Sequence, residues 1–519
     1  MVGVVGLALL AVCQSGLAVL SAQEARGKQI YVTGTTASGR EIAARVGSRS
    51  IPVPASAVVC AGCHGGDGLG RSESGVYPSD IRWSRLTKAY GAVSPGGRRR
   101  HPPYDEMSLK HALLAGLDPG NNRLDSAMPR FEMAGADLDD LISYLKRLES
   151  DLDPGLDRDR IVLGTVMPRS GPMAQIGAAI TAVMSAYFGD LNGTGGVYGR
   201  RIELRVARAD TREQSIERAR DLVEGQQVFA LIGALSGPAN PAFVELAEEH
   251  RVPFIGPFTQ STGADIGLRR HTFYLLADPY VQGRALVDYA SGRLPVAVTD
   301  AAVVHRNAPE LNGLADDMAQ RARHSGWGSV RQVAYPPAAM EAGRLVSELE
   351  SAGVRALFFL GADAEFQLLA RAAHEQRWAP KLFMHGYLSA RGAMSAPLSF
   401  RDRIYLAYPT SPRDHSPDGR REFGEFHARH RLSRQHLSAQ ITAYCAAKVL
   451  VRGLERSGRQ LGREKLIEAL EGLYEYSTGL SPPLTFGPNR RMGALGAYIV
   501  SVDLAERQFS SHSTWVEPR

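Results

Sequence analysis

The hydrophobic pattern of the chain changes character after residue 160. Before that point its clearest element is 137–148, where five large apolar residues fall on one helical face. These residues are Leu138, Leu141, Ile142, Leu145 and Leu148. Lys146 and Arg147 stand near the end of the segment, where cations interact favourably with the helix dipole. Together with a shorter helix expected over 25–32, the pattern predicts a small all-α first part.

From Ile161 onward, short apolar runs alternate with amphipathic segments. The first run is 161–166, and the segment after it places large apolar residues such as Ile180 and Phe188 on one helical face. Further strands are expected at 201–206, 228–232, 252–256, 301–305, 356–360, 381–384 and 404–407. This alternation predicts parallel, doubly wound α/β sheets. Because about 360 residues are too many for one such sheet, we expect two lobes.

Composition sets the class of protein but excludes little. The 519 residues are 44% hydrophobic and 22% charged, which is ordinary for a globular protein. Sixty basic and 54 acidic residues leave a small formal charge of +6. The densest basic cluster, 98–101, is interpreted as a solvated loop, with a docking patch for an acidic partner as the alternative. Nucleic-acid binding has no support beyond this mild basicity.

The first 22 residues are almost wholly apolar and precede a polar stretch. They predict a signal peptide cleaved after Ala22, which would place the mature chain in the periplasm. The leader has no Lys or Arg and is nearly long enough to span a bilayer, so an uncleaved membrane anchor is the alternative. Cys13 stands in a weak lipoprotein-like context. The expected organisation is signal peptide 1–22, first domain 23–150, polar linker 151–160 and second domain 161–519.

The chemistry of the first domain is concentrated in Cys60-Ala61-Gly62-Cys63-His64. Two thiols one helical turn apart can bond the two vinyl groups of a porphyrin, and the adjacent histidine can bind the iron. The alternatives are a disulfide, a zinc half-site or a thioredoxin-like redox pair. A zinc site would need a second ligand pair, which the sequence lacks, and a redox pair does not need His64. The motif predicts one covalently attached haem c, with the glycine-rich turn 65–70 wrapping its edge. Cys445, in the helical run 439–451, is expected to be a buried apolar residue.

Together with this motif, the stretch 127–131 (AMPRF) ahead of the last helix resembles class I c-type cytochromes. In that family a Met-Pro pair in an irregular loop supplies the sixth iron ligand. The resemblance implies that Met128 is the second axial ligand opposite His64. Met107 and Met133 are rival thioethers, and His101 or His111 would give bis-histidine ligation.

The second domain resembles the type 1 periplasmic binding proteins, in particular the branched-chain amino-acid-binding group. The resemblance rests on 164–177 (GTVMPRSGPMAQIG), 190–210 (DLNGTGGVYGRRIELRVARAD), 252–257 (VPFIGP) and 484–488 (LTFGP). It implies two Rossmann-like lobes that are joined by three crossovers and close on a small ligand. The first lobe would hold 160–280 with a later segment, and the second would hold 281–408 with the C-terminal strands.

Ligands of such sheets bind beyond the carboxyl ends of the strands. Three loops of the first lobe fit, namely 170–175, 234–237 and 257–261, with Ser170, Gln175, Ser236 and Thr259 as the polar side chains. The resemblance implies that the second and third of these loops, with Ser236 and Thr259, hold a ligand carboxylate. Alternatively, these hydroxyl residues only cap helices.

The second lobe departs from the pattern of the family. Amino-acid binders use an acidic residue in the loop that here reads His385-Gly386-Tyr387, which has no carboxylate. Glu310 and Asp363, which follow other strands of this lobe, could take the place of that acidic residue. Tyr387 is a further polar side chain that could contact the ligand. An aromatic or other small carboxylate therefore stands beside an amino acid as the expected solute.

These observations predict an exported monohaem cytochrome fused to a solute-binding protein, with a redox protein as partner. One alternative is a substrate-binding protein of a membrane ABC importer, in which the haem is regulatory. Another is a haem peroxidase-like enzyme, which needs an open iron position. No catalytic residues are predicted, since the sequence holds no GxSxG, HExxH or Walker motif.

Overall fold

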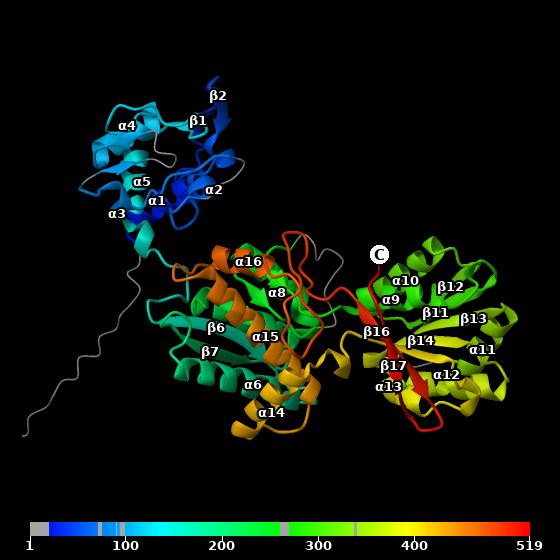
Figure 1. Cartoon of the computed structure of the whole chain (residues 1–519). Helices are drawn as coiled ribbons and strands as arrows, with labels where there is room; N and C mark the ends of the chain where they lie inside the picture. Colours follow the sequence, from blue (N-terminus) through cyan, green and yellow to red (C-terminus); the bar gives the residue numbers. More distant parts are fainter. Residues whose placement is uncertain are drawn as a thin grey trace, which may run out of the picture. The chain divides into compact units, whose positions relative to one another are not determined.

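The structure is a computed structural model that describes residues 20–70, 75–89, 91–93, 99–259, 269–336 and 340–518. Most of the expected signal peptide, including Cys13, therefore lies outside the described residues, as do Arg98 and the end of the loop 257–261. The chain divides after Asp153 into two compact units (Figure 1). Among the described helices, none combines the length and the apolarity needed to span a bilayer.

The first unit is mainly helical. Its helices are α1 (Ala22–Thr33), α2 (Cys60–His64), α3 (Trp83–Leu86), α4 (Glu106–Ala115) and α5 (Gly135–Arg147). Strands β1 (Ala43–Val46), β2 (Ile51–Pro54) and β5 (Arg130–Glu132) form a small antiparallel sheet, and β3 (Ala92–Val93) pairs with β4 (Arg100–His101). The two helices expected from the periodicity are present, whereas the short strands carry no comparable hydrophobic pattern.

Helices α1 and α5 cross at Gly27, where the backbones approach closely. A Cβ atom on Gly27 would lie 2.0 Å from the carbonyl oxygen of Asp140. One turn later the rings of Tyr31 and Tyr144 pack with centroids 5.5 Å apart, and Arg26 pairs with Asp140 at 2.7 Å. This crossing holds the stripe of α5, including Leu141 and Leu145, in the core of the unit.

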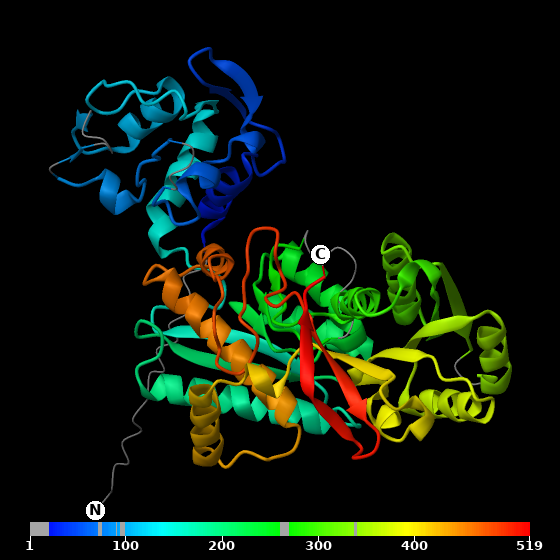
Figure 2. The same cartoon turned by 45° about the vertical axis from the view of Figure 1, so that its right-hand side comes forward.

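The second unit consists of two α/β lobes (Figure 2). The sheet of the first lobe is parallel, in the order β10-β9-β8-β6-β7. Its strands are β6 (Arg160–Met167), β7 (Arg201–Arg208), β8 (Ala230–Ile232), β9 (Phe254–Ile255) and β10 (Thr272–Phe273). Its helices are α6 (Ala174–Gly193), α7 (Arg212–Arg220), α8 (Asn240–Glu249), α14 (Pro417–Arg429), α15 (Leu437–Ser457) and α16 (Arg463–Glu471).

The sheet of the second lobe has the order β12-β11-β13-β14-β15-β16-β17, with only the last two strands antiparallel to their neighbours. Its strands are β11 (Asp300–Arg306), β12 (Ser329–Tyr335), β13 (Val354–Leu360), β14 (Lys381–His385), β15 (Ile404–Tyr408), β16 (Ala497–Asp503) and β17 (Gln508–Val516). Its helices are α9 (Pro279–Ser291), α10 (Pro309–His324), α11 (Ala342–Ser351), α12 (Asp363–Glu375) and α13 (Gly386–Met394).

The chain crosses between the lobes after β10, after β15 and before β16. The first and third crossings run side by side, since Gly493 and Ala494 donate backbone hydrogen bonds to Tyr274 and Leu275. The expected fold class, a small helical unit followed by a two-lobed α/β unit, is thus confirmed, although the first unit also contains short strands. The first crossing falls at 274–278, slightly earlier than expected, because α9 already packs on β14 of the second lobe.

Substituting Gly27 tests the α1–α5 crossing. In Gly27→Ala the new methyl group must push the helices apart, and overpacking of this kind costs about 1–3 kcal/mol. Denaturant unfolding of the first unit, followed through haem absorbance, should show this loss. The control is Gly135→Ala at the start of α5, where a Cβ meets nothing within 4 Å. Equal stability of the two variants would contradict this packing.

Candidate functional site

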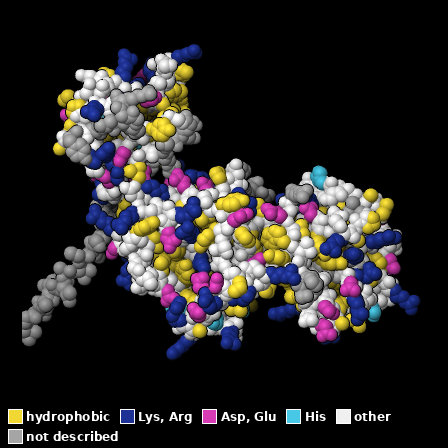
Figure 3. Space-filling view, in the orientation of Figure 1, with side chains coloured by type: hydrophobic (Ala, Val, Ile, Leu, Met, Phe, Trp, Pro, Cys, Tyr) yellow, Lys and Arg dark blue, Asp and Glu magenta, His cyan; other side chains and the backbone are white. Residues whose placement is uncertain are grey.

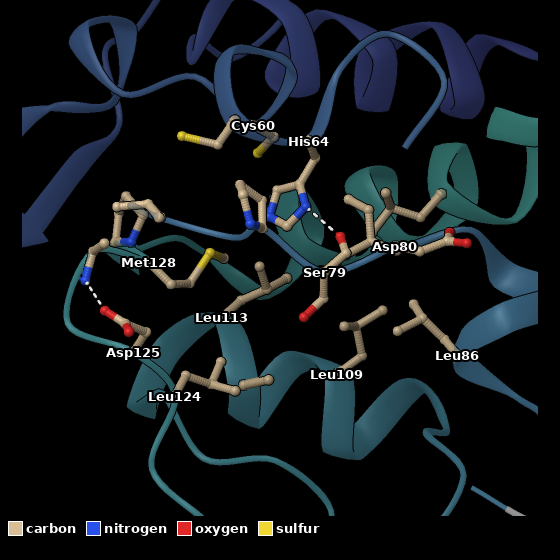
Figure 4. A pocket seen from close by; sticks show the side chains of 18 of the residues that line it. Cys60, His64, Ser79, Asp80, Leu86, Leu109, Leu113, Leu124, Asp125 and Met128 are labelled. Carbon is tan, nitrogen blue, oxygen red and sulfur yellow. Dashed lines mark hydrogen bonds between the residues drawn. The ribbon is translucent and has the colours of Figure 1, made fainter. Parts of the chain in front are cut away.

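The CxxCH motif forms the single helical turn α2. The turn begins after extended Val59 and ends at Gly65, whose φ of 74° favours glycine. Cys60, Cys63 and His64 line a cavity of about 720 Å³, walled largely by apolar residues of α3, α4, β5, α5 and the loop before β5 (Figure 4). These include Leu86, Leu109, Leu113, Leu124, Phe131, Leu141 and Leu145. Neither cysteine of the motif is in a disulfide.

The position of His64 is fixed by one hydrogen bond. Its ring is 7% exposed, and Nδ1 lies 2.9 Å from the carbonyl oxygen of Ser79. Because a carbonyl only accepts, Nδ1 carries the proton and Nε2 keeps its lone pair. Burial also lowers the pKa of His64, which favours the neutral ring. A neutral imidazole oriented by a second hydrogen bond is the form that binds a metal.

The glycine-rich turn brings Ser79 to His64. Gly68 and Gly70 have positive φ values of 73° and 87°, and a Cβ on Gly70 would lie 2.3 Å from the carbonyl oxygen of Pro78. Gly70 N–H donates to His64 O at 3.0 Å, and the buried Tyr31 hydroxyl donates to Gly65 O at 2.6 Å. The turn thus lies against the motif. None of its residues 65–70 lines the cavity, so its contact with the haem edge stays a prediction.

These residues fit a covalently bound haem. Two free thiols and a neutral imidazole stand on one side of a large apolar cavity, which matches the donor set of haem c. The described residues hold no cluster of three or more His, Cys, Asp or Glu that could bind a metal ion, so the zinc alternative gains no support.

Met128 reaches the same cavity from a loop that Arg130 holds in place. The Arg130 guanidinium donates to the carbonyl oxygens of Leu124 (3.0 Å), Asp125 (3.3 Å) and Met128. Asp125 in turn accepts from the backbone N–H groups of Ala127 (2.9 Å) and Met128 (3.1 Å). In Figure 4 the side chains of Met128 and His64 both point into the cavity.

The rival ligands are placed differently. Met107 is 80% exposed, and neither it nor Met133 or His111 lines the cavity. His101 does line it, with Nδ1 2.7 Å from the carbonyl oxygen of Pro102 and its ring against Tyr104. The geometry therefore leaves Met128 and His101 as the two residues able to approach a bound group opposite His64.

In the first lobe the structure brings Ser236 and Thr259 together. Ser236 is 4% exposed and donates to Asn240 Oδ1 at 2.9 Å, while Asn240 donates to the Tyr274 hydroxyl at 2.9 Å. Thr259 donates to Gly237 O at 3.2 Å, which links the two loops. The Ser236 side chain makes no helix cap. Ser236 therefore belongs to a buried network, whose partners Asn240 and Tyr274 the sequence did not single out.

The other two residues of the first lobe lie nearby in the chain but on the surface. Ser170 is exposed, and its backbone N–H donates to Asp210 Oδ1 at 2.7 Å. Gln175 is also exposed and falls in the first turn of α6 instead of in the preceding loop.

In the second lobe the two acidic candidates, Asp363 and Glu310, differ in burial and in role. Asp363 is partly buried and accepts from the Gly392 N–H at 2.7 Å, so it fixes α13. Glu310 is exposed in the first turn of α10. Burial, and then the charges of Asp278 and Glu310, raise the pKa of Tyr387, which places these side chains near one another. The sequence analysis missed Asp278, although an Asp-Pro pair before an amphipathic run is a helix-start signal.

His385 is a structural residue in this structure. It is fully buried, and its Nε2 lies 2.9 Å from the carbonyl oxygen of Pro279, which ties β14 to the start of α9. Burial lowers the pKa of His385 to about 4, so the ring is neutral near pH 7. The loop 385–387 therefore supplies no charge to a ligand.

The surface offers no concentrated basic region on the face drawn in Figure 3. There, Lys and Arg side chains are dispersed among acidic and hydrophobic ones over both units. This distribution agrees with the mild net charge of +6.

Comparison with known proteins identifies both units. Residues 160–508 match the family described as periplasmic binding protein, and 52–149 match the family described as cytochrome c. The chain is 25% identical over 218 residues to Leu/Ile/Val-binding protein homolog 3 of Brucella melitensis, covering 41% of this chain and 58% of that relative. It therefore spans less than two thirds of the length of that relative. It is 23% identical over 311 residues to homolog 7 of Brucella abortus, covering 57% and 77%.

Solved structures agree on the fold. A substrate-binding periplasmic protein from Ralstonia solanacearum superposes with a TM-score of 0.52 at 22% identity, covering 69% of this chain and 99% of that one. At this identity the likeness concerns the fold alone. The family match spans more than half of the chain. The chain thus belongs to the periplasmic binding protein family, and ahead of that fold it carries a cytochrome c domain, which implies a covalently attached haem c at the CxxCH motif.

Proposed function

We propose that this protein is a periplasmic electron carrier whose second unit binds a small carboxylated solute. The observation that supports the role as an electron carrier is that His64 and Met128 line the same cavity. When bound there, the haem iron supplies one-electron transfer by changing between its ferrous and ferric states. Cys60 and Cys63 would hold the group covalently, and His64 and Met128 would be its two axial ligands.

Hydrogen bonds within the protein hold both proposed iron ligands in position. The bond to Ser79 O holds the imidazole of His64 in one tautomer, and Arg130 fixes the loop that presents Met128. Apolar side chains such as Leu113 and Phe131 line the cavity, and low polarity around a Met/His pair favours a high reduction potential. With His64 and Met128 as its ligands the iron would have no open position, which disfavours a peroxidase-like reaction.

Replacing Met128 tests this assignment in the holoprotein. Met128→Ala should abolish the sulfur-to-iron absorption band of the ferric protein and its low-spin character. The reduction potential should fall by on the order of 0.1 V, since axial ligands set haem potentials over about 0.8 V. Met107→Ala, on the exposed side of α4, is the matched control and should change neither quantity.

A different axial pair would give the reverse pattern. If the spectrum of Met128→Ala is unchanged while that of His101→Phe loses its low-spin character, the ligation is bis-histidine and the assignment of Met128 is wrong.

For the solute we favour an amino acid. The loops of Ser236 and Thr259 lie near the start of α8, and the backbone N–H groups of a helix N-terminus suit a carboxylate. Across the lobes, Glu310 is the acidic candidate that is exposed, and a carboxylate there can pair with an α-ammonium group. The relatives named as Leu/Ile/Val-binding proteins support the same class.

A panel of solutes tests this choice by thermal unfolding. Leucine and phenylalanine should raise the melting temperature, since a ligand at a hundred times its Kd adds about 2.7 kcal/mol. Glu310→Gln should weaken amino-acid binding about tenfold or more. Asp363→Asn, the control, should lower the stability of α13 without changing the affinity for the amino acid.

If only the des-amino analogues of these amino acids bind at this site, with binding lost in Thr259→Val and unaffected by Glu310→Gln, the second unit is an organic-acid binder. The family also favours delivery of the solute to a membrane importer of the ABC class, which is the second function we consider. In that case a redox protein would act on the haem as a regulator.

A further inference from the structure

A second cavity lies where the chain passes between the two lobes of the second unit. It measures about 530 Å³, and we call it the hinge cavity. Its walls come from the first and second crossings, from α15 of the first lobe and from β16 and β17 of the second. None of the solute residues named above, all within the described part of the chain, lines it. It is therefore distinct from the proposed solute site.

The lining is rich in hydroxyl groups and has one fixed positive charge. The hydroxyl residues are Thr410, Ser411, Ser438, Thr442, Ser481, Ser510 and Ser513. Arg413, which is charged at all relevant pH values, donates to the carbonyl oxygen of Ser513 at 3.4 Å. The hydroxyl of Ser513 itself is buried and has no hydrogen-bond partner among the described residues. A buried polar group of this kind calls for a partner, which a ligand in the cavity would supply.

The remaining walls are apolar or neutral. Leu276, Ile441 and Phe509 present hydrocarbon surface. The cavity is lined by no carboxylate, and the adjacent Asp414 already accepts from the Ser411 N–H (2.8 Å) and the Tyr498 hydroxyl. A zwitterionic amino acid would find no carboxylate for its ammonium group on these walls, and one positive charge suits a singly charged anion.

We propose that the hinge cavity binds a small monocarboxylate with an apolar body. The carboxylate would lie between Arg413 and the hydroxyl of Ser513, and the apolar body would pack on Leu276, Ile441 and Phe509. The volume falls within the range of small-molecule sites. Because both lobes form the walls, the ligand contacts both and its affinity depends on the angle between them.

Benzoate and octanoate are the probes, with benzamide as the neutral match of benzoate, in calorimetric titrations of the full-length holoprotein. Both acids should bind, and benzamide should bind at least about tenfold more weakly, as should benzoate to Arg413→Gln. Arg421→Gln is the matched control, since Arg421 pairs only with Asp418 on the exposed side of α14 among the described residues. It should leave the affinity unchanged.

Two further variants locate the site. Ser438→Trp, at the exposed start of α15, should fill the hinge cavity and abolish benzoate binding while amino-acid binding is retained. Thr259→Val, in the solute site, should leave benzoate binding intact. Failure of both acids to bind the wild-type protein would overturn the proposal. So would benzoate binding that Thr259→Val abolishes, or that Arg413→Gln and Ser438→Trp leave unchanged.

Discussion

The hydrogen bond from His64 Nδ1 to the carbonyl oxygen of Ser79 determines what the first unit can do. It selects the tautomer whose Nε2 can bind a metal, and it orients the ring in the cavity. The bond exists because the glycine turn 65–70 folds back on α2, which requires positive φ at Gly68 and Gly70. The carbonyl oxygen of Gly65, in the same turn, accepts a hydrogen bond from the hydroxyl of Tyr31, which lies on α1 where α1 packs against α5. The packing of two helices at Gly27 thus supports the chemistry of the cavity.

In the second unit, as in the first, hydrogen bonds hold the loops that are proposed to contact a ligand. In both units a loop is held by buried polar contacts before any ligand arrives: Arg130 fixes the loop of Met128, and Ser236, Asn240 and Tyr274 fix the loops of the first lobe. Such preorganisation lowers the entropy lost when a ligand binds. The hinge cavity differs, because its walls belong to two lobes and it carries a fixed positive charge opposite an unpaired hydroxyl.

Much of the fold was predictable because its elements are strongly periodic or wholly buried. The stripe of α5 and the central strands β6, β11 and β13 are of this kind. Strand β12 was missed because it is an edge strand whose side chains are exposed or half-buried at all but one position. The haem motif could be read locally because five consecutive residues carry it. The role of Asp363 could not be predicted from the residues around it, since it depends on Gly392, 29 residues away.

We propose that His64 and Met128 together hold the haem iron of an electron carrier. Proton NMR of the ferrous holoprotein with methyl-labelled methionines tests it most directly, because a methyl group next to the porphyrin face feels its ring current. One methionine methyl signal should be shifted far upfield, and this signal should disappear in Met128→Leu. A spectrum without such a signal, or one in which Met128→Leu leaves the signal in place, would contradict it.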